Sequence, residues 1–193
     1  MHLAFHVLKV CCAIAVMLIG LSAIACTGHS GDDQPTPVLS SAPDTTFPMP
    51  PVKPNGDMGW VLSDGTRSRL ADHANKVLVL DFYATWCLPC RRSIPHLTSM
   101  QDRWAVRGLQ VVGLNVGGAD DRVKVAAFAG ELKIRYPLGF PDKSLTDLFL
   151  SDTEAIPQTF VFGRDGNLIK RFVGYDESIG TELEKTIQAA LEK

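Results

Sequence analysis

The apolar positions of the chain follow two periodicities that predict a layered α/β domain. Val77–Tyr83 and Leu109–Val116 are apolar runs typical of strands buried on both faces of a parallel sheet. The stretch from Pro89 to Val106 follows the first run and is expected to form a helix. A last helix is expected over residues 178–191, where an apolar stripe recurs every four residues: Ile179, Leu183, Ile187 and Leu191.

Turn residues predict two β-hairpins, one at the start of this domain and one before its last helix. Glycine and aspartate between short β-prone segments are a strong hairpin signal. The segments concerned are 59–62 and 66–70 around Ser63-Asp64-Gly65, and 158–162 and 168–173 around Gly163-Arg164-Asp165-Gly166-Asn167.

The region before the second hairpin is expected to be helical. Residues 120–135 are expected to form one helix, followed by a shorter helix near Ser144–Leu150. The longer helix would bury an apolar face made of Val123, Ala126, Ala127 and Leu132. The predicted order is therefore β-hairpin, βαβ, α, β-hairpin, α.

The first 25 residues have the pattern of an export signal. Val10 to Ala25 is an unbroken run of apolar and small residues, and its 16 residues are short for a membrane span of about 20. Three outcomes stay open: simple cleavage before Cys26, cleavage with lipidation of Cys26 as in a bacterial lipoprotein, and an uncleaved anchor. We expect lipidation, because an unpaired exported cysteine otherwise has no explanation.

Composition changes abruptly after the apolar run. Residues 27–56 contain seven of the chain's 12 prolines among Ser, Thr, Gly and Asp. Such a segment buries too little apolar surface to offset its ordering entropy. We therefore expect residues 26–57 to form a lipidated cysteine plus a flexible tether, and residues 58–193 to form the folded domain.

Charge and glycine patterns exclude several partners. A net charge of −2 argues against nucleic acid or an anionic membrane surface as the main partner. Asn115-Val116-Gly117-Gly118 lacks the Gly-Lys-Ser/Thr of a phosphate-binding loop and predicts only a βα turn. We expect no cofactor.

Cys87-Leu88-Pro89-Cys90 is the most informative motif, because it links the predicted strand Val77–Tyr83 to the predicted helix. Free amides and the helix dipole at a helix N-terminus favour a thiolate, so Cys87 is the candidate nucleophile. Cys90, one turn later, could then resolve a mixed disulfide. We expect thiol–disulfide exchange with Cys87 and Cys90 as the redox-active disulfide.

Three other interpretations of the cysteine pair are weaker. Structural disulfides usually come as several pairs, but the three other cysteines all lie before residue 27. A zinc site needs two more ligands, and only His73 and His96 are available as scattered residues. Inert core cysteines do not fit the neighbouring Trp86 and Pro89. We therefore expect no metal.

The chain resembles the thioredoxin superfamily over about Gly59–Leu191, and within it the exported TlpA/ResA-like thiol–disulfide oxidoreductases. The resemblance rests on Trp86-Cys87-Leu88-Pro89-Cys90, on Pro95, on Ile156-Pro157 and on the closing hairpin and helix. It implies a thioredoxin fold with a central mixed β-sheet flanked by helices, an added N-terminal β-hairpin and an inserted helical stretch.

The resemblance also implies where a substrate binds. In thioredoxin-like folds the proline that matches Pro157 is cis and lies beside the cysteine pair, and the preceding residue offers its backbone to a substrate strand. We therefore expect a cis Ile156–Pro157 bond and assign substrate binding to Trp86, Ile156 and Pro157.

Asp81 interrupts the apolar run six residues before Cys87. A buried carboxylate is costly and has a raised pKa. Thioredoxin resembles this chain here, with a buried aspartate that takes the proton of the resolving thiol; many TlpA/ResA-like proteins instead carry a glutamate at the position of Ser93. We hypothesise that Asp81 is the general base for Cys90. Pairing with a lysine or a place at the sheet rim are the alternatives.

These inferences favour an exported, lipid-anchored, monomeric reductase at the periplasmic or extracytoplasmic face. The resemblance implies electrons from a membrane thiol carrier and protein disulfide substrates, for example in cytochrome c maturation. A protein that introduces disulfides would share every motif, and a copper or haem-delivery module could use the same cysteines as ligands. The Pro-x-x-x-Thr-x-x-Cys pattern of peroxiredoxins is absent around Cys87.

Overall fold

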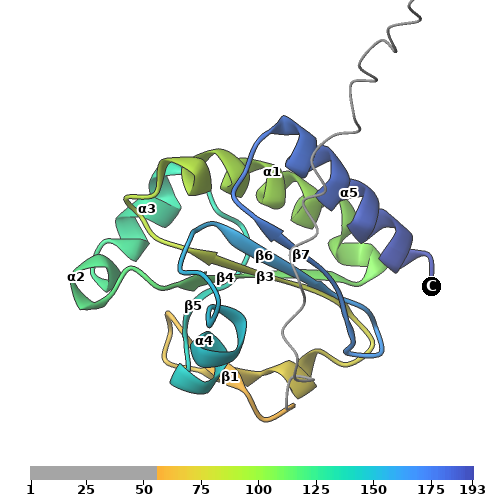
Figure 1. Ribbon diagram of the computed structural model, residues 1–193, viewed down its shortest axis with the longest axis horizontal. Coiled ribbons are helices and arrows are strands. Elements are labelled where there is room, and N and C mark those ends of the chain that lie inside the picture. The colour runs from red at the N-terminus through yellow and green to blue at the C-terminus, as the bar shows by residue number, and fades with distance from the viewer. Residues whose placement is uncertain (1–55) are drawn as a thin grey trace, which may run out of the picture. The chain divides into compact units, whose positions relative to one another are not determined.

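The computed structural model describes residues 56–193, and this part of the chain contains seven strands: β1 Gly59–Leu62, β2 Arg67–Arg69, β3 Val77–Tyr83, β4 Leu109–Asn115, β5 Leu138–Pro141, β6 Gln158–Phe162 and β7 Leu168–Val173. They form one mixed sheet in the order β2-β1-β5-β4-β3-β6-β7 (Figure 1). The predicted signal peptide, Cys26 and nearly all of the predicted tether lie outside the described residues.

Strand β3 lies in the middle of the sheet and leads directly to the cysteine pair. It is parallel to β4 on one side and antiparallel to β6 on the other. All seven of its residues are buried, as expected for an apolar run covered on both faces. Both predicted hairpins are confirmed, because β1 pairs with β2 and β6 with β7, each antiparallel.

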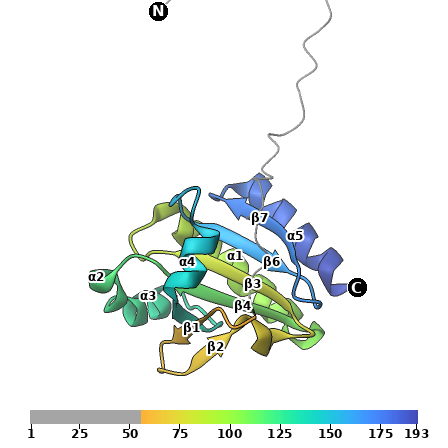
Figure 2. The same ribbon diagram turned by 60° about the horizontal axis from the view of Figure 1, so that its bottom comes forward.

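Helices cover both faces of the sheet (Figures 1 and 2). They are α1 Leu88–Trp104, α2 Ala119–Arg122, α3 Val125–Glu131, α4 Lys143–Phe149 and α5 Glu177–Leu191, with short 3-10 turns at Leu70–His73 and Ala105–Arg107. Side chains of α1, α3 and α5 join one hydrophobic cluster, and those of α4 join a second cluster on the opposite face. The stripe predicted for the last helix is buried. Among residues 56–193, no helix is both long and apolar enough to span a bilayer.

The two faces of β3 differ in what they contact. Val79 and Tyr83 belong to the cluster that also contains Cys87 and Cys90, whereas Leu80 and Phe82 join the cluster around α4. Side chains alternate between the faces of a strand. Asp81 therefore points to the face that carries the cysteine pair.

The single helix predicted for residues 120–135 is wrong. The chain forms two shorter helices instead, α2 and α3, separated at Val123 and Lys124. Val123 is 81% exposed, whereas Val125 and Phe128 are the buried residues of α3. Ala126 and Ala127 are exposed as well, so of the predicted apolar face only Leu132 packs against the hydrophobic cluster.

The same region contains strand β5, which was not predicted. It runs parallel to β4 and antiparallel to β1, and so joins the N-terminal hairpin to the parallel part of the sheet. Gly113 in β4 makes this approach possible, because a Cβ atom there would lie 2.6 Å from the side chain of Leu138 and 3.2 Å from that of Tyr136. The shorter predicted helix near Ser144–Leu150 is confirmed as α4.

Candidate active site

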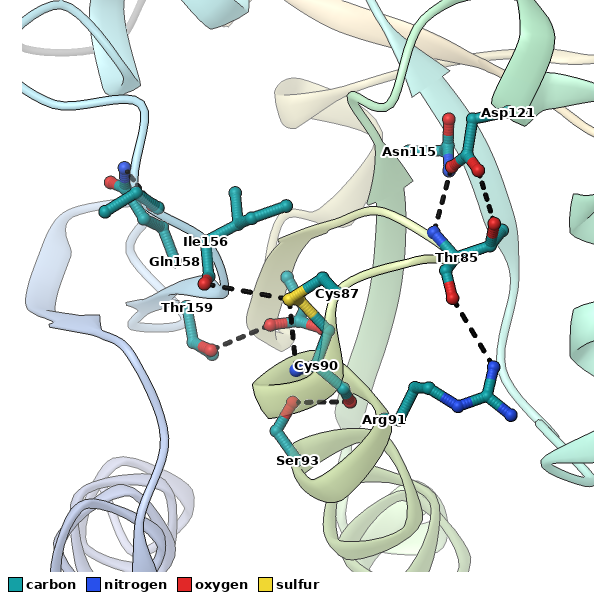
Figure 3. The surroundings of a disulfide bond; sticks show 12 residues. Thr85, Cys87, Cys90, Arg91, Ser93, Asn115, Asp121, Ile156, Gln158 and Thr159 are labelled. Atoms are coloured by element: carbon teal, nitrogen blue, oxygen red, sulfur yellow. Dashed lines mark hydrogen bonds between the residues drawn. A yellow bond between two sulfur atoms is a disulfide. The ribbon is translucent and has the colours of Figure 1, made fainter.

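Cys87 and Cys90 form a disulfide at the start of α1, with an S–S distance of 2.04 Å (Figure 3). Cys87 is the N-cap residue, and Pro89 lies in the first turn, where a missing amide costs nothing. The amide of Cys90 donates a hydrogen bond to the Sγ atom of Cys87 at 3.2 Å. Strand, turn and helix thus place both sulfur atoms together, as the sequence predicts.

The two sulfur atoms differ in their surroundings. Cys87 is 4% exposed and Cys90 is fully buried, so an attacking partner meets Cys87 first. An amide donor and the positive end of the helix dipole both favour negative charge on the Cys87 sulfur. The arrangement suits Cys87 as the attacking thiolate and Cys90 as the thiol that resolves a mixed disulfide.

The Ile156–Pro157 peptide bond is cis, as expected. The carbonyl oxygen of Ile156 lies 3.7 Å from Sγ of Cys87, on the side away from Thr85 and Asp121 (Figure 3). In the disulfide this sulfur carries no proton, but after reduction the Cys87 thiol can donate to the same carbonyl group. The backbone of Ile156 and Pro157 therefore lies beside the reactive sulfur, and we call this segment the ledge.

Apolar side chains surround the entrance to the cysteine pair. Trp86 is 64% exposed and Leu88 is 74% exposed, although both are large hydrophobic residues. Ile156 is half-buried on the other side of Cys87. Exposed apolar surface of this kind is typical of interaction sites, so binding of substrate at Trp86 and Ile156 stays a prediction.

Asp81 is completely buried beneath this entrance. One carboxylate oxygen accepts a hydrogen bond from the Thr159 hydroxyl at 2.8 Å, and the other has no partner in the described part of the chain. Burial raises the pKa of Asp81 to about 7, and the Thr159 bond offsets only part of this effect. Asp81 has no salt-bridge partner among residues 56–193 and does not lie at the sheet rim, so neither structural alternative applies.

The position at which the resemblance to TlpA/ResA-like proteins implies a glutamate is Ser93 in this chain. Ser93 is buried, and its hydroxyl donates to the carbonyl oxygen of Cys90 at 3.0 Å. His96 contacts Tyr175 and Glu184 between α1 and α5, and Thr98 donates to a carbonyl group of its own helix. Asp81 is therefore the candidate proton acceptor on this face of the sheet.

Asp121 holds the turn before Cys87 and was not predicted. This buried carboxylate in α2 accepts hydrogen bonds from the amide of Thr85 at 2.9 Å, from the Thr85 hydroxyl, and from the side-chain amide of Asn115 at 2.7 Å (Figure 3). Burial alone would raise the pKa of Asp121, but the bonds from Thr85 and Asn115 hold it below its ordinary value. Gly117 leaves the space that the carboxylate occupies. The sequence around Asp121 gives no reason to choose it over the adjacent Asp120.

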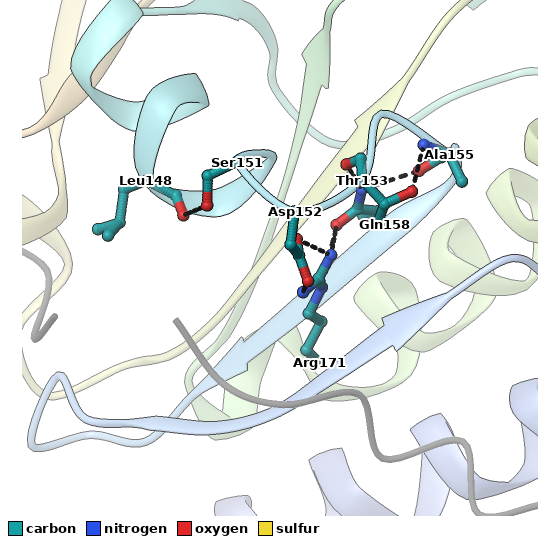
Figure 4. A network of polar contacts seen from close by, with 7 residues as sticks. All are labelled: Leu148, Ser151, Asp152, Thr153, Ala155, Gln158 and Arg171. Atoms are coloured by element: carbon teal, nitrogen blue, oxygen red, sulfur yellow. Dashed lines mark hydrogen bonds and ion pairs between the residues drawn. The ribbon is translucent and has the colours of Figure 1, made fainter. Parts of the chain in front are cut away.

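A buried arginine braces the loop on the other side of Cys87 (Figure 4). Arg171 in β7 is 1% exposed and donates to the side-chain oxygen of Gln158 at 2.7 and 3.0 Å, and to Asp152 at 2.8 and 2.9 Å. The Gln158 amide then donates to the carbonyl groups of Thr153 and Ala155 at 2.8 and 2.9 Å. The network therefore fixes the loop that ends at the cis-proline. In the sequence Arg171 stands beside Lys170 in β7, and nothing local shows which of the two is buried.

The described residues contain no group of three or more His, Cys, Asp or Glu side chains placed to hold a metal ion. The chemistry available in this part of the chain is that of two thiols, a buried carboxyl group and a backbone ledge. That combination suits the exchange of disulfides.

Known proteins resemble the chain in sequence and in fold. It matches the AhpC/TSA family over residues 39–171. It is 28% identical over 118 residues to thiol-disulfide oxidoreductase ResA of Bacillus subtilis (strain 168), covering 60% of this chain and 64% of that protein. It is 26% identical over 183 residues to the ResA protein of Geobacillus kaustophilus (strain HTA426), covering 92% and 91%.

A solved structure agrees with these relatives. The thiol:disulfide interchange protein of the thioredoxin family from Chlorobium tepidum TLS is 27% identical, with a TM-score of 0.60 over 72% of this chain and 98% of that one. The match thus spans slightly less than two thirds of the Bacillus subtilis protein and nearly all of the Chlorobium protein. These findings confirm the resemblance to thioredoxin-like, ResA-type proteins and the α/β fold class.

Proposed function

The chain belongs to the AhpC/TSA family, and from this membership and the geometry around Cys87 we propose that it is a thiol–disulfide oxidoreductase that reduces protein disulfides. The observation that carries the proposal is the Cys87–Cys90 disulfide at a helix N-terminus beside the cis Ile156–Pro157 bond. The ResA-type relatives support it.

The reaction proceeds in two exchange steps. In the reduced protein, the Cys87 thiolate attacks one sulfur of a substrate disulfide; a Cys87–substrate disulfide forms and the other substrate sulfur leaves as a thiolate. Cys90 then loses its proton to Asp81 and attacks Sγ of Cys87, which releases the second substrate sulfur and forms the Cys87–Cys90 disulfide. Two electrons pass from the cysteine pair to the substrate, and a dithiol donor must return them.

We extend the proposal to the setting of this reaction. The apolar run before Cys26 and the proline-rich segment after it support export and a lipid anchor on an extracytoplasmic membrane face. A membrane thiol carrier would then supply the electrons, and exported apoproteins, such as apocytochrome c, would receive them. We propose that the protein works as a monomer, because one chain supplies both cysteines, the carboxyl group and the ledge.

The reduction potential of the Cys87–Cys90 couple tests the direction of electron flow. We expect a value near the ~−270 mV of thioredoxin, and a value near the ~−120 mV of DsbA would show that the protein introduces disulfides instead. A Cys90→Ser variant should accumulate substrates as mixed disulfides with Cys87, since nothing resolves them. Mass spectrometry of the trapped adducts would identify the substrates.

A further inference from the structure

A hollow of about 640 Å³ lies directly beside the redox pair. Its walls come from the turn before Cys87, the end of β4, helix α4 and the loop before the cis-proline; the lining includes Trp86, Val116, Leu150, Ile156, Asp147 and Glu154. Ile156 lines the hollow with its side chain and approaches Cys87 with its carbonyl group. A polypeptide bound at Cys87 can therefore extend directly into this hollow.

The lining combines apolar side chains with negative charge. Trp86, Val116 and Ile156 provide apolar surface, and the charged residues of the lining are Asp147 and Glu154. Asp147 already pairs with Lys143 at 2.6 Å. Glu154 is exposed and makes no hydrogen bond or ion pair within residues 56–193. The hollow thus presents one uncompensated carboxylate at its edge.

Glu154 lies in a segment whose backbone is held by hydrogen bonds on both sides. The carbonyl groups of its two neighbours, Thr153 and Ala155, both accept hydrogen bonds from the Gln158 amide. Arg171 in turn holds the Gln158 side chain. Binding a partner at Glu154 therefore orders little additional backbone, which favours recognition at this position.

We propose that this hollow binds the substrate segment that flanks the reacting cysteine, and that Glu154 selects segments with a lysine or arginine next to an apolar residue. The inference rests on the proposed function and names the class of substrate it acts on. The apolar residue packs against Trp86 and Ile156 while the cation pairs with Glu154. Charge complementarity of this kind acts mainly on the rate of productive encounter.

Two synthetic peptides test the proposal with the reduced protein. They share one disulfide and one apolar residue, and differ only in a lysine or a glutamate next to that residue. We expect the second-order rate of exchange, followed by thiol release, to be about fivefold higher for the lysine peptide, a factor within reach of one exposed ion pair. The preference should fall at high salt, because exposed charges are screened.

Variants of Glu154 identify the residue responsible. Glu154→Gln should remove the preference and Glu154→Lys should reverse it, whereas Glu192→Lys, with the same change of net charge on the exposed last turn of the chain, should keep it. Equal rates for both peptides in the unaltered protein overturn the subsite. A lysine preference that persists in Glu154→Lys overturns the role of Glu154. Absence of exchange with either peptide would instead contradict the proposed function itself.

Discussion

Asp81 and Asp121 are both buried around the turn that carries the redox pair, but the two carboxylates meet different surroundings. Asp81 accepts one hydrogen bond, from Thr159, and its second oxygen has no partner in the described chain. Asp121 accepts two bonds from Thr85 and one from Asn115. The pKa of Asp81 is raised to about 7, whereas that of Asp121 is lowered. Hydrogen-bond donors as well as burial therefore decide the charge of a carboxyl group.

This difference suits the two groups to different tasks. Asp121 stays ionised and holds the amide of Thr85, so it acts as an anchor for the turn that ends at Cys87. Asp81 can take up and release a proton near neutral pH, on the face of β3 that carries Cys90. We propose that Asp121 positions the reacting group and that Asp81 exchanges its proton.

The largest expected effect concerns the proton acceptor. Asp81→Asn keeps the shape of the side chain but removes the base, so we expect resolution of the mixed disulfide by Cys90 to slow about 100-fold at pH 7. Rapid acid quenching of a reaction with a disulfide peptide measures this step. The pH–rate profile should lose its inflection near pH 7. Asp121→Asn is the matched control and should keep that inflection; an unchanged profile in Asp81→Asn would contradict the assignment.

The same substitution at Asp121 should instead destabilise the fold. An asparagine there would turn a donor group toward Thr85 or Asn115, so we expect a loss of about 2–3 kcal/mol in the free energy of unfolding. Urea titration at pH 7 measures it. Asp120→Asn, at the exposed neighbouring position, should change stability by less than about 0.5 kcal/mol. Equal stability of the two variants would show that the clamp at Asp121 contributes nothing.

The two carboxyl groups should also respond to pH with opposite signs. The folded-state pKa of Asp81 is raised, so its contribution is fully present below about pH 4 and is lost as pH rises through about 7. Between pH 5 and 7 we expect a decline of about 2 kcal/mol, which Asp81→Asn should abolish. The pKa of Asp121 is lowered, so its contribution is present above about pH 4 and is lost as pH falls below that value. Urea titrations of the oxidised protein from pH 3 to 8 test both; a wild-type slope in Asp81→Asn would contradict the shift.

The residues that could be predicted from the sequence carry local signals. Cys87 and Cys90 are one helical turn apart, and Asp81 is a charge within an apolar run. Asp121 has no such signal, since its partner Thr85 lies 36 residues away and the adjacent Asp120, which is the same residue type, is exposed. The hydrogen bonds of Asp121 to Thr85 and Asn115 can form only once β3 and β4 are paired.

The same reasoning explains which elements were predicted. Strand β3 and helices α1 and α5 have long apolar patterns that specify them locally, and they were placed within two residues of their observed limits. Strand β5 has only four residues, with glycine and proline among them, and becomes a strand because β4 and β1 pair with it. The break before α3 has no local signal either, because residues 119–125 contain no proline or glycine.

The smallest effect on the exchange rate is expected for Arg171. This residue holds the loop before the cis-proline, whereas Asp121 holds the turn before Cys87 on the other side of the sulfur. Arg171→Met removes the bonds to Gln158 and Asp152, but the Gln158 amide can still hold Thr153 and Ala155. We therefore expect only a three- to tenfold slower exchange with disulfide peptides, about 1 kcal/mol in the barrier.

The exchange rate of Arg171→Met reports on positioning only at temperatures where the variant is fully folded. Exchange rates of Arg171→Met should be taken well below its unfolding transition, with Arg135→Met, which loses an exposed ion pair to Asp102, as the control. If Arg171 positions the ledge at Ile156, the fully folded variant is slower than the control. If Arg171 only stabilises the sheet, the variant unfolds at lower urea concentration but exchanges at the control rate. The second result would restrict the positioning role of the two braces to Asp121, on the turn before Cys87.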